Sequence, residues 1–242
     1  CGGGGGGSGS GGNVVDDWEY LDPFPSFNQP PKPSYPAGLD ALSVLAQRPE
    51  TQPQRNIFLQ TNDFIVAYDL YPKAKVHLLV LPRKRIDSPT DLSASDAPLV
   101  KSMGRLGKSL ARNLRARDSS LAPFGLGFHA APSMRQLHLH VISLDLDSEC
   151  LKHKKHWNSF ATGFLVPPEV FVQQLEGAEG KVASKGHAVE EARLKADMLC
   201  PVSGAPLKNM PAVKARLKEA AYLEALRAAA GGRDVVRRWP LV

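Results

Sequence analysis

The stretch QLHLHVIS, residues 136–143, places two imidazoles and an amide within an apolar segment. Because side chains alternate between the two faces of a strand, a strand here presents Gln136, His138 and His140 on one face. The leucines and the valine between them form the other face, which we expect to be core. A neutral imidazole is a nucleophile toward phosphorus, and its neighbours in phase can donate hydrogen bonds to phosphate oxygens. The pattern therefore favours nucleophilic catalysis on a phosphate.

Two alternative roles fit the same two histidines. They could be core residues whose rings are bonded to backbone carbonyls, or they could be ligands of a metal ion, since neutral imidazole is a common ligand. Against a metal, the strand offers no third protein ligand in phase, because glutamine is a poor one. We therefore expect neither a metal nor a cofactor at this strand.

The neighbouring segments predict the elements that must position this stretch. Residues 38–50 resemble a short helix, and residues 56–84 predict three strands separated by turns at TND and YPKAK. Apolar residues recur at steps of three or four in 95–117, which predicts an amphipathic helix packed on a core. Two more strands around a Pro-Ser turn are expected in 124–147, and a short helix in 167–175. The fold class is therefore α+β, with a largely antiparallel sheet.

Charge and cysteine content bound the class of protein. The formal net charge is +6, and residues 181–242 hold 12 Lys or Arg against 6 Asp or Glu. A basic tail on a neutral remainder suggests a polyanionic partner, although a solvated lysine-rich helix accounts for the charge equally simply. The three cysteines, Cys1, Cys150 and Cys200, are too few for a disulfide framework, which favours a reducing compartment. No apolar run reaches the ~18 residues of a membrane span, so no membrane partner is expected.

The motif HLHVIS and its preceding strand resemble the signature of the histidine-triad family. The longer stretch HAAPSMRQLHLHVISLDLDSECLKHKKHWNSF, residues 129–160, is similar to the aprataxin branch, which removes AMP from 5′-adenylated DNA ends. YDLYPKAKVHLLVLPRK, residues 68–84, matches the nucleotide-binding strands of the same family. The resemblance spans about 38–175 and departs from the family where Gln136 replaces the first histidine. It implies a histidine-triad fold, in which about five antiparallel strands are flanked by helices.

The resemblance also implies a reaction and the residues that perform it. The expected activity is that of a DNA 5′-adenylate hydrolase in single-strand break repair, which acts through a covalent His–AMP intermediate. His138 is the nucleophile, and His140 and Ser133 donate hydrogen bonds to the phosphate. Gln136 gives a supporting hydrogen bond, and His129 protonates or stabilises the departing DNA phosphate.

Further residues are expected to bind the substrate. Asp69 accepts hydrogen bonds from the ribose hydroxyls, a role that suits a carboxylate, and Lys73 and Lys155 neutralise phosphate charge. His77 is expected to be structural. The residues expected to contact DNA near the site are Lys152, Lys154 and Trp157. For Trp157, a place in the core is the alternative to stacking against a terminal base pair.

The C-terminal segment resembles the zinc finger of aprataxins with most of its ligands replaced. Cys200 stands at the first ligand position, but Ser203 and Arg216 stand at the second and third. Because one thiolate does not hold structural zinc, we predict a finger without metal. Its helix retains a basic face that is expected to follow DNA phosphates. The residues of that face are Lys208, Lys214, Arg216 and Lys218.

These expectations give a domain plan and a set of partners. A Gly/Pro-rich mobile leader is predicted in 1–37, a catalytic domain in 38–176 and a basic DNA-binding module in 188–242. The expected partners are adenylated nicks, 5′ ends and RNA–DNA junctions, with AMP as product, a monomeric state and a nuclear location. Two alternatives differ in function. One is a general histidine-triad hydrolase of nucleoside phosphoramidates or dinucleoside polyphosphates, and the other is a non-catalytic module that binds DNA ends.

Overall fold

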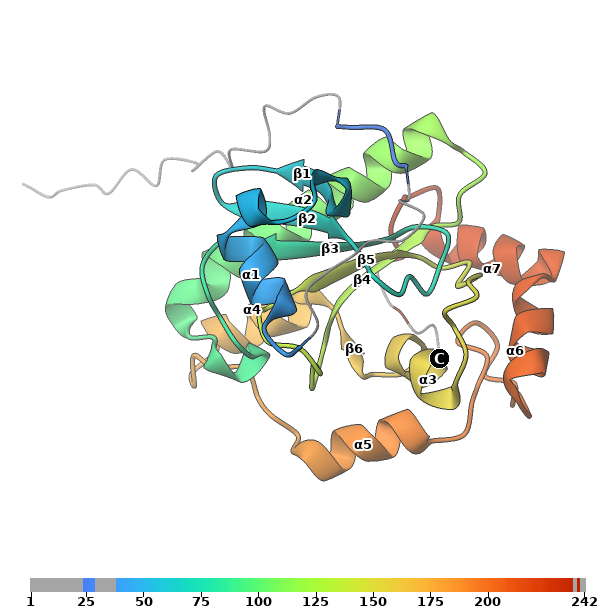
Figure 1. Cartoon of the computed structure of the whole chain (residues 1–242). Helices are drawn as coiled ribbons and strands as arrows, with labels where there is room; N and C mark the ends of the chain where they lie inside the picture. Colours follow the sequence, from blue (N-terminus) through green and yellow to red (C-terminus); the bar gives the residue numbers. More distant parts are fainter. Residues whose placement is uncertain (1–23, 29–37, 237–238, 240–242) are drawn as a thin grey trace, which may run out of the picture.

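A six-stranded antiparallel sheet forms the centre of the molecule (Figure 1). The computed structural model describes residues 24–28, 38–236 and 239. The strands follow the order β1-β2-β3-β5-β4-β6 across the sheet. Their bounds are β1 Ile57–Gln60, β2 Phe64–Tyr68, β3 His77–Pro82, β4 Phe124–His129, β5 Leu139–Ser143 and β6 Leu165–Val166. The predicted α+β class and antiparallel sheet are confirmed. The sixth strand, β6, has only two residues and was not predicted from the sequence.

Seven α-helices flank the sheet in the described residues. Their bounds are α1 Ala41–Gln47, α2 Ala97–Arg117, α3 Lys154–Ala161, α4 Pro168–Glu176, α5 His187–Lys195, α6 Met210–Leu217 and α7 Ala220–Ala230. The amphipathic helix predicted in 95–117 is α2, which buries Leu106, Leu110 and Leu114 along one face. None of these helices is both long and apolar enough to cross a bilayer.

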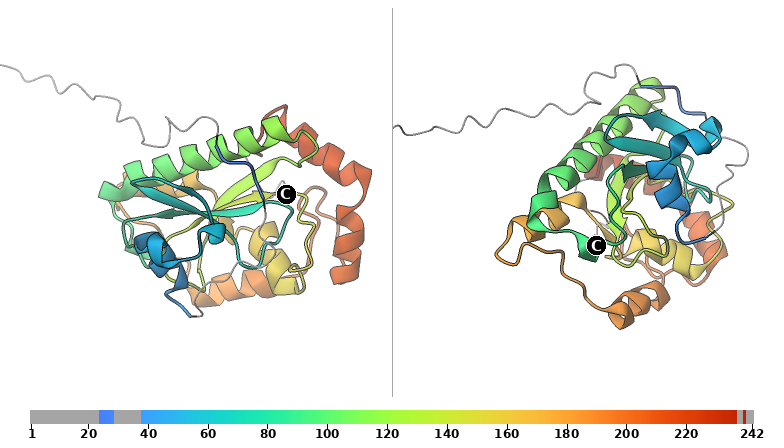
Figure 2. Two further views of the ribbon diagram at one scale, coloured as in Figure 1. Left: turned by 45° about the horizontal axis from the view of Figure 1, so that its top comes forward. Right: turned by 60° about the vertical axis from the view of Figure 1, so that its left-hand side comes forward.

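Helix α2 lies across one face of the sheet, and α1, α3 and α5 lie on the opposite side (Figure 2). Gly107 allows this close packing, because a Cβ atom there would come within 3.2 Å of Leu126 and Leu139. The alternate residues of β5 and of the segment before it, including Leu139 and Val141, belong to the core beneath α2. The predicted alternation of this strand is therefore confirmed for Leu139 and Val141. His140, which lies between them, and His138, which precedes them, line the cavity on the other face.

The opposite face of the sheet is covered at its two ends. Helix α1 packs on β2 and β3, where Leu42 and Leu45 join a small cluster with Leu79. Helix α3 covers the other end, where its residue Phe160 contacts the rings of His77 and His140. The imidazoles lie on the face between these two helices, where they line a cavity together with residues of α5.

The C-terminal helices share a hydrophobic cluster with the residues that follow β5. Tyr222 and Leu226 of α7 are fully buried together with Leu144 and Trp157. The Tyr222 hydroxyl also donates a hydrogen bond to the carbonyl of Leu144 at 3.0 Å. The C-terminal segment is thus held against the sheet by apolar burial, which contributes roughly 25 cal/mol per Å² of apolar surface removed from water.

Five residues of the predicted leader are described, 24–28, and they lie against the core. Phe24 is buried, and the ring of Phe27 lies 5.5 Å from the ring of Tyr68. The rest of the predicted leader lies outside the described residues.

Candidate active site

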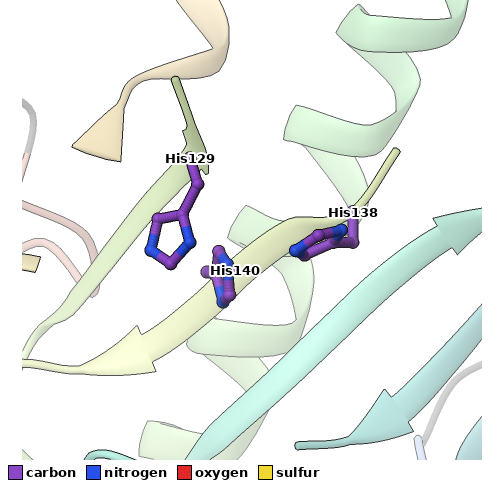
Figure 3. A group of neighbouring side chains, drawn as sticks. All are labelled: His129, His138 and His140. Atoms are coloured by element: carbon purple, nitrogen blue, oxygen red, sulfur yellow. The ribbon is translucent and has the colours of Figure 1, made fainter. Parts of the chain in front are cut away.

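A cavity of about 930 Å³ lies on this face of the sheet and is lined by residues of α1, α3 and α5. Six histidines line it, and three of them lie close together: His138 just before β5, His140 within β5, and His129 at the end of β4. Figure 3 shows the three rings gathered together from these two neighbouring strands. The ring centroids of His129 and His140 are 4.2 Å apart, and those of His138 and His140 are 5.0 Å apart. Sequence alternation placed His138 and His140 together, and the β4–β5 pairing adds His129.

His138 is held as a neutral ring with one nitrogen free. Its Nδ1 atom lies 2.8 Å from the carbonyl oxygen of Gln136. Since a carbonyl oxygen only accepts, Nδ1 carries the proton and Nε2 keeps its lone pair. Burial lowers the pKa of His138, although the Gln136 carbonyl and the carboxylate of Asp69 act in the opposite direction. A neutral imidazole with an unprotonated Nε2 is the form that acts as a nucleophile.

The protonation of His140 follows from a chain of hydrogen bonds that begins at a backbone amide. The Lys73 N–H donates to His77 Nδ1 at 3.2 Å, so the proton of His77 must be on Nε2. That Nε2 lies 2.9 Å from Nδ1 of His140 and donates to it. The remaining nitrogen of His140, Nε2, therefore carries a proton, and it is buried with no hydrogen-bond partner among the described residues. His140 thus offers an N–H donor to a ligand in the cavity.

His77 is more than the structural residue that the sequence suggested, because it sets the tautomer of His140. It is almost completely buried, and burial lowers its pKa to about 4. Asp69, whose Oδ2 atom is 3.7 Å from His77 Nε2, opposes that shift. Alternation along the strand VHLLVL puts His77 and Leu78 on opposite faces of the sheet. The side-chain contact between His77 and His140 depends on β3 lying beside β5.

His129 is also neutral and has a free nitrogen. Burial lowers its pKa well below the ordinary value, and the nearby rings of His138 and His77 act in the same direction. In the described part of the chain, its Nε2 atom is buried without a hydrogen-bond partner. It can therefore exchange a proton with a ligand that displaces water from the cavity.

The imidazoles also form two groups that could hold a metal ion. One group is His129, His138 and His140, and the other is Asp69, His77 and His140, each with its ligand atoms within 4.8 Å of one another. The strand itself offers no third ligand, as the sequence indicated, and in the folded chain β4 supplies one, His129. The hydrogen-bond network nevertheless commits His140 Nδ1 to His77, so a metal would have to bind through the other nitrogen or break this bond.

The rim of the cavity carries the residues expected to bind substrate. Asp69, Lys73, Ser133 and Lys155 all line it. Burial lowers the pKa of Lys73, while the carboxylate of Asp69 opposes the change. Apolar side chains that sequence reasoning did not select complete the walls, namely Leu39, Leu42, Leu79 and Met134, together with the exposed ring of Tyr71. Only the packing of α1 on the sheet could have revealed them.

Several known proteins resemble this chain in sequence. Residues 43–156 match the family model for the C-terminal binding region of the scavenger mRNA decapping enzyme. Adenosine 5′-monophosphoramidase HINT3 of Danio rerio is 33% identical over 121 residues, covering 49% of this chain and 72% of that protein. Aprataxin of Danio rerio is 42% identical over 154 residues, covering 64% of this chain and 46% of that protein.

The chain is an aprataxin-like member of the histidine-triad family. It spans less than half the length of the Danio rerio aprataxin. Among solved structures, the aprataxin ortholog Hnt3 in complex with DNA superimposes with a TM-score of 0.61 at 25% identity. That alignment covers 79% of this chain and 98% of the Hnt3 chain.

Gln136, which stands where the histidine-triad motif has its first histidine, does not act on the ligand directly. It is fully buried and does not line the cavity. Its Nε2 atom donates to the carbonyl oxygens of Pro82 and Lys84, at 2.8 and 2.9 Å. Its φ of +80° breaks the strand alternation on which the prediction rested, because β5 becomes regular only at Leu139. Gln136 therefore gives its supporting hydrogen bond through its backbone carbonyl, which accepts from His138 Nδ1, and its part in the reaction stays a prediction.

The predicted DNA-contacting residues fall into two groups. Lys152, Lys154, Lys208 and Lys218 are exposed, and Lys214 is half-buried. Trp157 is fully buried, and its indole N–H donates to the carbonyl of Leu199 at 3.3 Å. The role of Trp157 as a wedge against a base pair is therefore wrong, and the alternative of a core residue is correct. Arg216 is bonded to the neighbouring side chains of Cys200 and Glu219.

A second, smaller hollow lies beside the active site. It has a volume of about 270 Å³ and is lined by Lys154, Lys208, Asp197 and three apolar or proline residues. Lys154 is adjacent in sequence to Lys155, which lines the main cavity. Basic side chains thus lead from the imidazoles along α3 to the C-terminal segment.

Proposed function

We propose that the chain is a DNA 5′-adenylate hydrolase, which releases AMP from the 5′ ends left by abortive ligation during single-strand break repair. The observation that carries the proposal is the pair of imidazoles with fixed and opposite roles. His138 has a free Nε2 lone pair, and His140 has an N–H directed into the same cavity. A nucleophile beside a fixed donor is the arrangement that phosphoryl-type transfer needs.

The reaction follows from these roles in two steps. His138 Nε2 attacks the phosphorus of the AMP moiety in line, forming a P–N bond as the P–O bond to the DNA 5′-phosphate breaks. The DNA 5′-phosphate leaves as an anion and needs no proton, and His129, whose ring is neutral, stabilises its charge. Water then attacks the same phosphorus, the P–N bond breaks and AMP leaves, so that His138 is regenerated as a neutral ring.

The surrounding groups stabilise charge and orient the nucleotide. The N–H of His140 and the hydroxyl of Ser133 donate to the non-bridging oxygens, where negative charge accumulates. Lys73 and Lys155 offset the charge of the two phosphates, and Asp69 accepts hydrogen bonds from the ribose hydroxyls.

Three observations favour DNA as the carrier of the AMP. The basic line from Lys155 through Lys154 to Lys208 has no use in hydrolysis of a small nucleotide. Residues 181–242 hold twice as many basic as acidic residues, 12 against 6. Hnt3, whose structure aligns with 79% of this chain, was solved with DNA. Phosphate contacts of this kind give salt-dependent affinity without sequence specificity.

A second candidate function is hydrolysis of small AMP phosphoramidates, which the similarity to HINT3 favours. The two functions are separated by measuring turnover on adenylated nicked DNA and on AMP-lysine with the same preparation. Because DNA adds phosphate contacts that AMP-lysine lacks, we expect kcat/KM to be roughly 100-fold higher for the DNA substrate and to fall steeply with salt. Equal values on both substrates, with no salt dependence, would favour the phosphoramidase.

A further inference from the structure

The C-terminal segment begins with a tight hairpin that has the form of a zinc knuckle. Cys200 N–H donates to the Ala205 carbonyl and Gly204 N–H donates to the Cys200 carbonyl, both at 2.8 Å. Leu199 and Pro206 form an isolated β-bridge that closes the hairpin. Helix α6 then packs beside it, in the order hairpin then helix that zinc fingers use.

The side chains at this knuckle do not fit zinc. A structural zinc site needs four ligands from cysteine and histidine, and only Cys200 is present, because the second position is Ser203 and the third is Arg216. Among the described residues, the groups of three ligand side chains that could hold a metal all lie in the active-site cavity. The aprataxin-like fold therefore implies a metal that this chain has no means to bind at the hairpin.

The guanidinium of Arg216 lies where it can contact the remaining thiol. Its Nε–H donates to Cys200 Sγ at 3.5 Å, and its Nη1 forms an ion pair with Glu219. Cys200 is fully buried, and the side chain of Arg216 is only 22% exposed. Helix α6 is therefore bonded to the hairpin through a cation, at the position from which a metal ligand would extend.

The surroundings of the sulfur favour a negative charge on it. Burial acts to raise the pKa of the Cys200 thiol, but hydrogen bonds from Arg216, from the Ser203 hydroxyl and from the backbone amides of Val202 and Ser203 together lower it. A thiolate held by backbone N–H groups is also what a zinc knuckle contains, with zinc as the counter-ion. Here a guanidinium lies beside the sulfur, and Glu219 forms an ion pair with the same guanidinium.

We propose that Arg216 takes the place of a metal ion and fastens α6 to the 199–206 hairpin, so that the C-terminal segment folds without zinc. The apolar cluster made by Val213, Leu217, Tyr222 and Leu226 with the main domain supplies the rest of the stabilisation. Arg216 is thus a structural residue, and this role replaces the one predicted from the sequence, a contact with DNA phosphates. Of the other basic residues predicted to contact DNA in this segment, Lys208 and Lys218 are exposed.

The test compares Arg216→Leu with Lys218→Leu, a matched loss of one positive charge two residues further on. Metal content is measured on the purified full chain, Tm is measured with and without EDTA, and affinity for nicked DNA is measured across a salt series. We expect no more than about 0.1 zinc per chain and no effect of EDTA on Tm, because a structural zinc would couple metal binding to folding. Arg216→Leu should lower Tm by about 5 °C, because a buried charge-assisted hydrogen bond is lost.

Lys218→Leu should show the opposite pattern. Its Tm should stay within about 1 °C of the unmodified chain, and its log Kd against log salt slope should fall by about one, as expected for a lost phosphate contact. The inference is overturned if the chain carries stoichiometric zinc that Cys200→Ser abolishes, if EDTA lowers Tm, or if Arg216→Leu leaves Tm unchanged and reduces the salt slope instead. Should Arg216→Leu not fold, Arg216→Lys, which keeps the charge but loses the planar fork, must still lower Tm.

A reconstruction variant tests the geometry directly. Ser203→Cys, Arg216→His and Ala220→His together supply Cys-x2-Cys and His-x3-His at zinc-finger spacing. We expect this variant to bind one zinc per chain and its Tm to become sensitive to EDTA; failure to bind zinc would overturn the claim that Arg216 stands at a ligand position. Turnover of AMP-lysine, which depends on the proposed active site and needs no DNA contact, is followed in every variant, so that failure of the proposed function is seen separately.

Discussion

Gln136→Leu should destabilise the protein by about 2–4 kcal/mol, although leucine has a similar volume. The amide of Gln136 donates to two carbonyl oxygens, those of Pro82 and Lys84, and Gln136 is completely buried. Leucine leaves both acceptors without this donor, at a cost of about 1–3 kcal/mol for each buried group, but it also removes Oε1 of Gln136, which is buried without a partner among the described residues, and this offsets part of the loss. The backbone strain at φ +80° remains in the variant, so the change isolates the amide.

Urea unfolding with linear extrapolation measures the loss, and Gln136→His provides the matched comparison. A neutral imidazole has one N–H and can satisfy only one of the two carbonyls, so its destabilisation should lie about halfway between glutamine and leucine. Because the carbonyl of residue 136 accepts from His138 Nδ1, both variants should also lower kcat, by about 10-fold for leucine. If Gln136→Leu unfolds within about 0.5 kcal/mol of the unmodified chain, the amide does not hold the end of β3 and this reasoning is refuted.

Other predictions concern the imidazoles. His77→Leu removes the donor to His140 Nδ1, so His140 can adopt either tautomer. The kcat on adenylated nicked DNA should fall by roughly 10-fold, while KM should change by less than about 3-fold. A rise in KM as large as the fall in kcat would instead indicate a distorted pocket. The depressed pKa of His77, about 4, means that the unfolded chain binds a proton that the folded chain does not between about pH 6.5 and 4. The contribution of His77 to the free energy of unfolding is therefore fully present above about pH 6.5, and about 3 kcal/mol of it is lost as the pH drops to about 4. His77→Gln should reduce this pH dependence, and a free energy of unfolding that does not change over this range in the unmodified chain would contradict the prediction. Added Zn²⁺ at about 10 µM should inhibit AMP release reversibly, because His129, His138 and His140 can bind it through the nitrogens that the reaction uses; inhibition that survives EDTA would rule out binding of this kind.

Local patterns in the sequence predicted much of the fold. The apolar alternation of residues 137–141 predicted the side of the sheet that faces α2, and the leucine spacing in 95–117 predicted α2 itself. These features depend on neighbours along one strand or helix, and such neighbours are visible in a sequence. Strand β6 was missed because two residues carry no period.

The site could be predicted only in part, because several of its features depend on contacts between distant segments. His138 and His140 were placed correctly, yet the tautomer of His140 is determined by His77, sixty-three residues away in sequence. The positive φ of Gln136 and the complete burial of Trp157 follow from how β3 and the C-terminal segment pack, and no periodic pattern reports such contacts. The same holds for the contact between Arg216 and Cys200.

The central claim is that Nε2 of His138 becomes bonded to the phosphorus of AMP. The most direct measurement uses nicked DNA whose adenylate carries a labelled phosphate, mixed with excess protein and quenched in alkali, where a P–N bond to histidine persists. Peptide mapping should then find the label on His138 during the first turnover, and on no peptide of His138→Ala, which should still bind AMP. Release of AMP at the full rate with no label on His138 at any time point would contradict the account.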